Sequence, residues 1–236
     1  MDHPTSAAPR RRIALIHALR NSVEPILAAF ARRWPEAETF NLLDDSLSAA
    51  REVDGRLTTP IIERFLTLGR YAAATQVGGR RTDAILFTCS AFGPAIEAVR
   101  SEHAIPVLRP NEGAFEQALA RGRRVGLLVT FPPSLESLAD ELRDQAARLG
   151  TPCDVRGVLV PGALAALQAG RGDEHDEAIA ASAAALDDVD VVVLGQFSMA
   201  RARTAMSRPL QARVLTTPDA AVEQLRARFV AEPVQT

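Results

Sequence analysis

The sequence contains no lysine, and all 27 of its basic residues are arginine. Without lysine there is no Schiff-base residue, which excludes pyridoxal-phosphate and class I aldolase chemistry. A P-loop is excluded as well, because that motif needs a lysine on the phosphates. The four histidines show no metal-ligand spacing with each other or with the cysteines, so we expect no metal site.

Cysteine, net charge and long apolar runs are also scarce. Two cysteines do not make a disulfide framework, which favours a reducing cytoplasm. The formal charge of -2 gives no basic field, so nucleic acid is not an expected partner. No apolar run reaches the roughly 18 residues of a membrane span, so a membrane is not expected either. Residues 1–10 are polar and lack the apolar segment of a secretory signal, and we interpret them as a disordered tail.

Short apolar runs alternate with longer amphipathic stretches along the 236 residues. This alternation predicts an α/β fold with parallel sheets, since strands covered on both faces are almost wholly apolar. The expected strands are residues 12–17, 38–42, 83–88, 105–108, 124–129, 154–159, 190–195 and 212–215.

The chain also resembles itself at a domain-sized distance. Residues 11–16 match 123–128, and residues 83–89 match 190–196, with offsets of 112 and 107. We therefore expect two pseudo-symmetric lobes, residues 11–115 plus 217–236 in the first and 116–216 in the second. Ligands of parallel sheets bind beyond the carboxyl ends of the strands, so the site should lie in the cleft between the lobes.

Cys89 is the foremost candidate for chemistry. It follows an apolar strand and precedes Ser90 and Ala91, where a helix is expected to begin. A helix N-terminus would lower the pKa of the thiol, favour the thiolate and offer backbone N–H groups to a carboxylate. The alternative is a buried structural cysteine.

The motif around Cys89 resembles that of the aspartate/glutamate/hydantoin racemase superfamily, which also includes arylmalonate decarboxylase and maleate isomerase. Residues 84–90 look like the strand and first cysteine of that family, 124–130 like the strand opening its second lobe, and 191–195 like the strand before its second cysteine. The resemblance implies two lobes around one site, no metal or cofactor, a small carboxylate substrate and a homodimer.

The chain departs from the family where the second cysteine is expected, because Gln196 stands there. Racemases of this family use one cysteine on each face of the α-carbon, and glutamine does not titrate. The other cysteine, Cys153, begins a predicted strand at the wrong end for the cleft.

Three interpretations remain open. In the first, the protein is an isomerase and another group, with His17 at the end of the first strand as the best candidate, supplies the second proton. In the second, Cys89 alone protonates an enediolate, as the cysteine of the family's arylmalonate decarboxylases does from the second lobe. In the third, the fold binds a small carboxylate without catalysis.

Other residues follow the predicted strands and are candidates for substrate contact. Backbone N–H groups near the strand ends would serve a carboxylate or a developing enediolate. Asp45 and Ser46 would either contact substrate or cap the next helix. The full set of binding candidates is Ser90, Ala91, Asp45, Ser46, Thr130, Phe131, Gln196, Phe197 and Ser198.

Overall fold

The computed structural model describes residues 10–231 and contains two four-stranded parallel sheets. The first has the strand order β2-β1-β5-β6, and the second has the order β10-β9-β7-β8. The strands of the first sheet are β1 (Arg12–His17), β2 (Glu38–Leu43), β5 (Ala84–Phe87) and β6 (Val107–Leu108). Those of the second are β7 (Arg124–Val129), β8 (Asp154–Leu159), β9 (Val191–Leu194) and β10 (Val214–Thr216).

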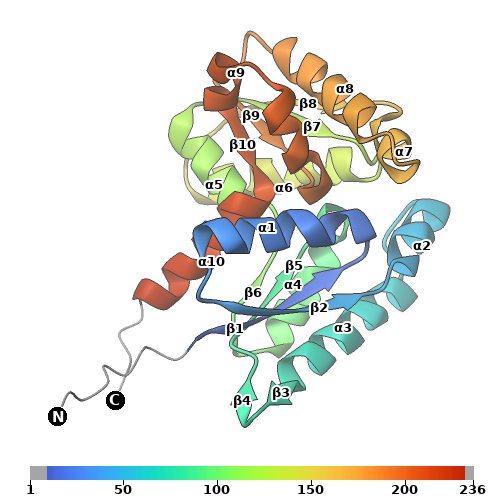
Figure 1. Cartoon of the computed structure of the whole chain (residues 1–236), viewed down its shortest axis with the longest axis vertical. Helices are drawn as coiled ribbons and strands as arrows, with labels where there is room; N and C mark the ends of the chain where they lie inside the picture. Colours follow the sequence, from blue (N-terminus) through green and yellow to red (C-terminus); the bar gives the residue numbers. More distant parts are fainter. Residues whose placement is uncertain (1–9, 232–236) are drawn as a thin grey trace.

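Helices cover both faces of each sheet, so the α/β fold predicted from the sequence is confirmed (Figure 1). The first lobe has α1 (Val23–Arg33), α2 (Ser46–Asp54), α3 (Thr59–Ala74) and α4 (Gly93–Glu102). The later helices are α5 (Glu112–Arg121), α6 (Ser134–Arg148), α7 (Ala163–Gln168), α8 (Gly172–Ala184), α9 (Arg208–Arg213) and α10 (Thr217–Ala231). Three 3₁₀ segments are η1 (Arg20–Ser22), η2 (Ser90–Phe92) and η3 (Phe197–Ala205).

The two lobes repeat the same construction. In sheet position, β1, β2, β5 and β6 correspond to β7, β8, β9 and β10. Asp83, before β5, accepts a hydrogen bond from the backbone N–H of Arg12 at 2.7 Å. Asp190, before β9, accepts one from the backbone N–H of Arg124 at 2.9 Å, and its pKa is lowered to about 2 chiefly by the Arg124 guanidinium. An aspartate at the equivalent position of each lobe thus holds the first residue of a strand, Arg12 of β1 in the first lobe and Arg124 of β7 in the second.

The helices near the lobe junction show which sheet each one covers. Helix α5 buries Phe115 and Ala118 in the core of the second sheet, although residues 112–115 were expected in the first lobe. Helix α10 places Val222 and Leu225 in one core cluster with Leu15 of β1. Figure 1 shows α1 crossing the middle of the molecule between the two sheets, and α10 running from this junction to the lower left along the first lobe.

Several strand boundaries differ from the expectation. The predicted strand 212–215 begins only at Val214, because residues Arg208–Arg213 form α9 with a proline in its first turn. A two-stranded hairpin, β3 (Gln76–Val77) with β4 (Arg80–Arg81), was not expected. Its turn is Gly78-Gly79, with φ of 58° and 77°, a conformation that glycine adopts readily.

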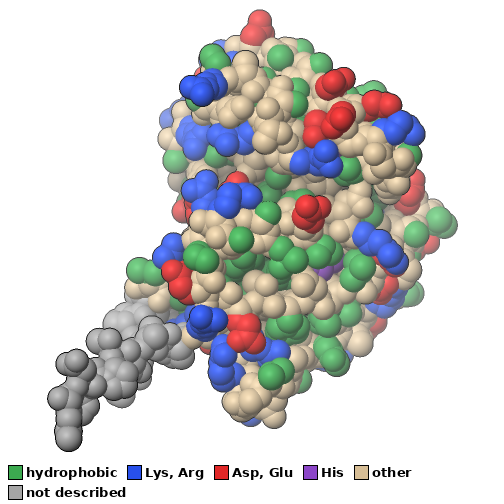
Figure 2. Space-filling view, in the orientation of Figure 1, with side chains coloured by type: hydrophobic (Ala, Val, Ile, Leu, Met, Phe, Trp, Pro, Cys, Tyr) green, Lys and Arg blue, Asp and Glu red, His purple; other side chains and the backbone are tan. Residues whose placement is uncertain are grey.

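The predicted tail lies outside the described residues except for Arg10. Within residues 10–231, no helix is long and apolar enough to cross a membrane. Arginine and acidic side chains are interspersed on the face that Figure 2 shows.

Candidate active site

A small cavity, with about 310 Å³ of empty space including its open mouth, lies where the carboxyl ends of both sheets meet. Its walls come from the segments after β1, β2, β5, β7 and β9, as expected for parallel sheets facing each other. The lining residues are Leu19, Ser22, Ser48, Thr88, Cys89, Ser90, Ala91, Phe92, Phe131, Ser134, Gln196, Phe197 and Ser198.

Cys89 lies in this cavity directly after β5, with 6% of its surface exposed. Its Sγ accepts a hydrogen bond from the backbone N–H of Ala18 at 3.0 Å. Burial raises the pKa of the Cys89 thiol to about 11, although hydrogen bonds from Ala18, Thr88, Leu19 and Ser22 oppose this rise. The thiol form therefore predominates at neutral pH.

This pKa contradicts the expectation of a lowered value. Helix α4 begins only at Gly93, because the 3₁₀ turn Ser90–Phe92 separates it from Cys89. The thiol is buried, so loss of hydration outweighs the hydrogen bonds that favour the thiolate.

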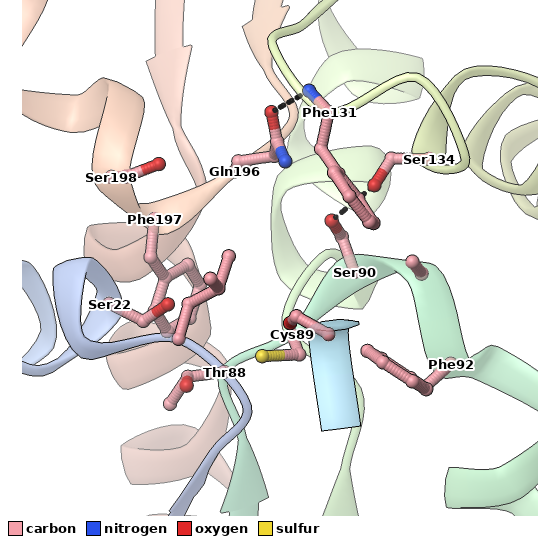
Figure 3. A pocket seen from close by; sticks show the side chains of 13 residues that line it. Ser22, Thr88, Cys89, Ser90, Phe92, Phe131, Ser134, Gln196, Phe197 and Ser198 are labelled. Carbon is pink, nitrogen blue, oxygen red and sulfur yellow. Dashed lines mark hydrogen bonds between the residues drawn. The ribbon is translucent and has the colours of Figure 1, made fainter. Parts of the chain in front are cut away.

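Gln196 faces the cavity from the second lobe at the position equivalent to Cys89 (Figure 3). Its Oε1 accepts hydrogen bonds from the backbone N–H groups of Thr130 at 2.6 Å and Phe131 at 3.2 Å. The Thr130 hydroxyl donates a third bond to the same oxygen at 2.8 Å. Three donors fix the orientation of the amide, and its Nε2 donates no hydrogen bond to any described residue.

Two serines connect the lobes beside the sulfur. Ser90 Oγ and Ser134 Oγ lie 3.2 Å apart, and either can be the donor. Ser90 follows Cys89, while Ser134 begins α6 of the second lobe. Figure 3 shows this pair next to Phe131, to the right of Cys89 and Gln196. This hydrogen bond therefore joins the two lobes at the wall of the cavity.

His17 does not line the cavity, although it is fully buried at the end of β1. Its Nδ1 is 2.8 Å from Thr88 Oγ1 and its Nε2 is 2.9 Å from Asn41 Oδ1. Burial lowers the pKa of the imidazole, so the neutral form is favoured. Since both nitrogens are engaged, His17 joins three strands and holds Thr88 beside the cysteine.

Three more candidates lie outside the cavity lining. Asp45 is exposed and accepts a hydrogen bond from Arg20 at 2.7 Å, and Ser46 donates to Asp44 at 2.6 Å. Neither side chain caps α2. Thr130 acts on the site only through Gln196.

Cys153 precedes β8, at the end of the second sheet that lies away from the cavity. Its side chain is partly buried against the core of the second lobe. Among the residues that the structure describes, no group of three histidine, cysteine or acidic residues could hold a metal ion.

Sequence reasoning missed several lining residues, and the repeat contains a signal for two of them. Ser22 and Ser134 are 112 residues apart, the same offset as the first strands of the two lobes. Ser22 ends η1 and directly precedes α1, Ser134 is the first residue of α6, and both line the cavity. Extending the repeat alignment past the strand ends would have identified them. Ser48, which donates to the Ala18 carbonyl at 2.7 Å, has no such counterpart in the alignment.

Two α/β lobes face each other across one cavity at the carboxyl ends of their parallel sheets, and this arrangement defines the fold class. A family model described as Asp/Glu/Hydantoin racemase matches residues 23–225, so the chain belongs to that family. No curated protein matches the chain in sequence.

Solved structures of racemases share the fold. Glutamate racemase isoform RacE1 from Bacillus anthracis superposes with a TM-score of 0.69 at 12% identity, covering 94% of this chain and 82% of that one. Allantoin racemase from Klebsiella pneumoniae gives 0.66 at 20% identity, covering 94% and 88%. Aspartate racemase from Picrophilus torridus gives 0.68 at 10% identity, covering 92% and 94%. At these identities the likeness supports the fold alone, whereas the family match supports a racemase-like function.

Proposed function

We propose that this protein is an isomerase-type enzyme that transfers a proton at the carbon next to the carboxylate of a small acid. Cys89 is the proton-transfer residue, and the enzyme needs no metal or organic cofactor. The proposal depends chiefly on the placement of Cys89 Sγ in the cavity, opposite a Gln196 amide that occupies the equivalent position of the other lobe.

The proton step requires only the sulfur and hydrogen-bond donors. The Cys89 thiolate removes the proton from the α-carbon, and the electron pair of the C–H bond moves onto a carboxylate oxygen to give an enediolate. N–H groups at the starts of η2 and η3 lack intrahelical acceptors and lie at the cavity, where they stabilise that oxygen. The Cys89 thiol then returns a proton to the carbon.

A single titrating group confines this exchange to one face of the substrate. Gln196 neither removes nor supplies a proton, and His17 lies outside the cavity. We therefore propose that Cys89 exchanges the α-proton with retention, rather than inverting the carbon between two thiols. An isomer forms where the enediolate is conjugated with a neighbouring double bond and the Cys89 thiol returns the proton to the far carbon of that system, because a proton returned to the α-carbon on the same face regenerates the substrate.

One observation favours a second candidate, a decarboxylase. Because the pKa of Cys89 is raised to about 11, the resting residue is a proton donor. In this reaction the C–C bond to a second carboxylate breaks, carbon dioxide leaves, and the bonding electrons form the enediolate. Cys89 then donates its proton to carbon, and the resulting thiolate takes a proton from water.

Proton NMR in D₂O tests the proposal directly. The protein would be incubated with small carboxylic acids and substituted malonates, beside the Cys89→Ala variant and a Cys153→Ala control. Deuterium incorporation at the α-carbon that requires Cys89 but not Cys153 supports the isomerase, and Cys89-dependent loss of a malonate carboxyl supports the decarboxylase. Binding of a carboxylate without either reaction would contradict both and indicate a binding protein.

A further inference from the structure

Among residues 10–231, no charged side chain lines the active-site cavity. Of its thirteen lining residues, six carry hydroxyl groups, one is Gln196, one is Cys89, and the remaining five are apolar or aromatic. Arg20, which follows the lining residue Leu19, pairs with Asp45 at the surface, 2.7 Å apart. Glu141 and Arg109, which lie against Gly93 directly after the lining residue Phe92, form an ion pair with each other and do not line the cavity. A substrate that enters the cavity therefore meets neutral hydrogen-bonding groups and apolar surface.

In a cavity without charged side chains, the carboxylate and the ammonium group of an amino acid differ in how well they are accommodated. A carboxylate is satisfied by N–H donors alone, as at helix N-termini. Removing an ammonium group from water is strongly unfavourable unless an acidic group pairs with it, and the thirteen lining residues include no aspartate or glutamate. The lining thus disfavours an α-ammonium group, while Phe92, Phe131 and Phe197 offer apolar contact.

The orientation of Gln196 adds a directed donor to this cavity. Three hydrogen bonds hold Oε1 against Thr130 and Phe131, so the NH₂ group is the part of the amide left for a ligand. Figure 3 shows the amide nitrogen turned away from the Phe131 N–H to which the oxygen is bonded. An amide held in this way donates hydrogen bonds and does not accept a proton.

We propose that the site takes a small carboxylate whose α-carbon bears an uncharged substituent, an alkyl, aryl or acylamino group, and that Gln196 Nε2 donates a hydrogen bond to the substrate oxygen on which negative charge develops. This inference rests on the proposed function and specifies its substrate class. In the proton step, the Gln196 N–H bonds stay intact, and only Cys89 exchanges a proton with carbon.

Matched substrates test the charge preference. Alanine and phenylglycine would be compared with N-acetylalanine and N-acetylphenylglycine by deuterium incorporation in D₂O. The acetylated compounds are expected to react with a kcat/KM higher by about tenfold or more, because they bring no ammonium into the cavity. Cys89-dependent exchange confined to the free amino acids would preserve the proposed function and overturn this inference.

The Gln196→Glu variant tests the donor. One carboxylate oxygen would accept the same hydrogen bonds from Thr130 and Phe131, while the other would replace the NH₂ donor with a negative charge. Relative to wild type, the preference for acetylated over free amino acids is expected to fall by about tenfold or more. An unchanged preference would overturn the role of Gln196. Gln76→Glu, the same substitution at an exposed residue of the β3–β4 hairpin, is the control.

Binding gives a second readout that does not depend on turnover. Thermal unfolding would be measured with each of the four compounds at millimolar concentration. Stabilisation by the acetylated compounds and not by the free amino acids is expected in wild type, and its loss is expected in Gln196→Glu. If no compound exchanges and the acetylated ones fail to stabilise the protein, the inference is overturned.

Discussion

Cys89 and Gln196 occupy equivalent positions in the two lobes and bind equivalent backbone groups. Cys89 Sγ accepts a hydrogen bond from the Ala18 N–H at 3.0 Å, and Gln196 Oε1 accepts one from the Thr130 N–H at 2.6 Å. Cys89 and Gln196 are 107 residues apart, and Ala18 and Thr130 are 112 apart, the two offsets of the internal repeat. The backbone N–H that binds the Cys89 sulfur in the first lobe thus has an equivalent in the second lobe, where it binds the amide oxygen of Gln196.

The pH dependence of the exchange reaction should report the Cys89 thiol. Because burial raises its pKa to about 11, the thiolate fraction in the free enzyme grows as pH rises towards that value. For α-proton removal, kcat/KM should increase about tenfold per pH unit below 11. For decarboxylation, which uses the thiol, it should be level through neutrality and decrease only above about 11.

Replacing the sulfur supplies the matching control. Cys89→Ser should lower kcat/KM by about 10²–10⁴, because a hydroxyl is a far weaker acid than a thiol. Cys153→Ser should have no such effect. Comparable losses in both variants would contradict the assignment of Cys89.

A second cysteine should change the stereochemical outcome. In Gln196→Cys, the new sulfur would meet the N–H groups of Thr130 and Phe131, on the face opposite Cys89. Deuterium should then enter the α-carbon with inversion, and a single enantiomer of the substrate should become racemic. Chiral chromatography of the product measures this. Incorporation with complete retention in the variant would show that the two positions do not face the α-carbon from opposite sides.

His17 should act on Cys89 only through position. His17→Leu leaves Thr88 Oγ1 and Asn41 without their imidazole partner and should cost about 1–3 kcal/mol of unfolding free energy. Activity should decrease through misplacement of Thr88, but the shape of the pH–rate profile should not change. The control is His103→Leu, the same substitution at the histidine that directly follows α4. Loss of one limb of the pH profile in His17→Leu would instead indicate that His17 transfers a proton.

The same histidine predicts a dependence of stability on acid. Its folded-state pKa is lowered from 6.5 by burial, so the folded protein holds the neutral imidazole. The stability that the folded protein gains from the neutral His17 is complete above pH 6.5. It is lost as the pH falls below that value, since the unfolded chain then binds a proton that the folded protein does not. In His17→Leu, that part of the decline should be absent from urea unfolding curves measured between pH 7 and pH 5.

Glu141 should affect stability in the opposite sense to His17, because its contribution to stability is lost as the pH rises. This residue of α6 lies 3.7 Å from Arg109 and is deeply buried, and burial raises its pKa from 4.5 to about 7. Its folded state therefore favours the neutral acid, and stability from this group is lost as the pH rises from about 4.5 through 7. Glu141→Gln should be more stable than wild type at pH 8 by about 1–3 kcal/mol and should match it near pH 4.5.

Urea unfolding at both pH values measures this difference. Glu136→Gln, in the first turn of the same helix, provides an acidic residue for comparison. A Glu141→Gln variant that is less stable at pH 8 would mean that the ion pair with Arg109 outweighs the burial of the carboxylate.

The bounds of β1, β7 and β8 agree with the expectation at both ends. In β1 and β7 the apolar run is flanked by polar residues, Arg12 and His17 in the first and Arg124 and Thr130 in the second, so the local sequence marks where the strand begins and ends. The predicted strand 212–215 failed at its start, because Pro209 permits a helical turn that the apolar pattern does not reveal.

The candidate site was predicted only in part for a related reason. The segments after β5, β7 and β9 contribute Cys89, Phe131 and Gln196 to the cavity, as their positions at strand ends suggested. Asp45 and Ser46 also follow a strand, but their side chains pair with surface groups, whereas Ser48 in the first turn of α2 lines the cavity. Position at a strand end is a local property, whereas proximity to the cavity depends on the direction in which the folded segment turns each side chain.

The sequence by itself determined the repeat, the α/β alternation, the cysteine after β5 and the glutamine at the equivalent position, because each is a property of residue type and spacing. Only the tertiary structure decided the raised pKa of Cys89, the engagement of both His17 nitrogens and the neutral lining of the cavity. Burial and hydrogen bonding depend on groups from distant segments. Cys89 meets Ala18 across 71 residues and Gln196 meets Thr130 across 66, and these contacts form only when the two sheets are assembled.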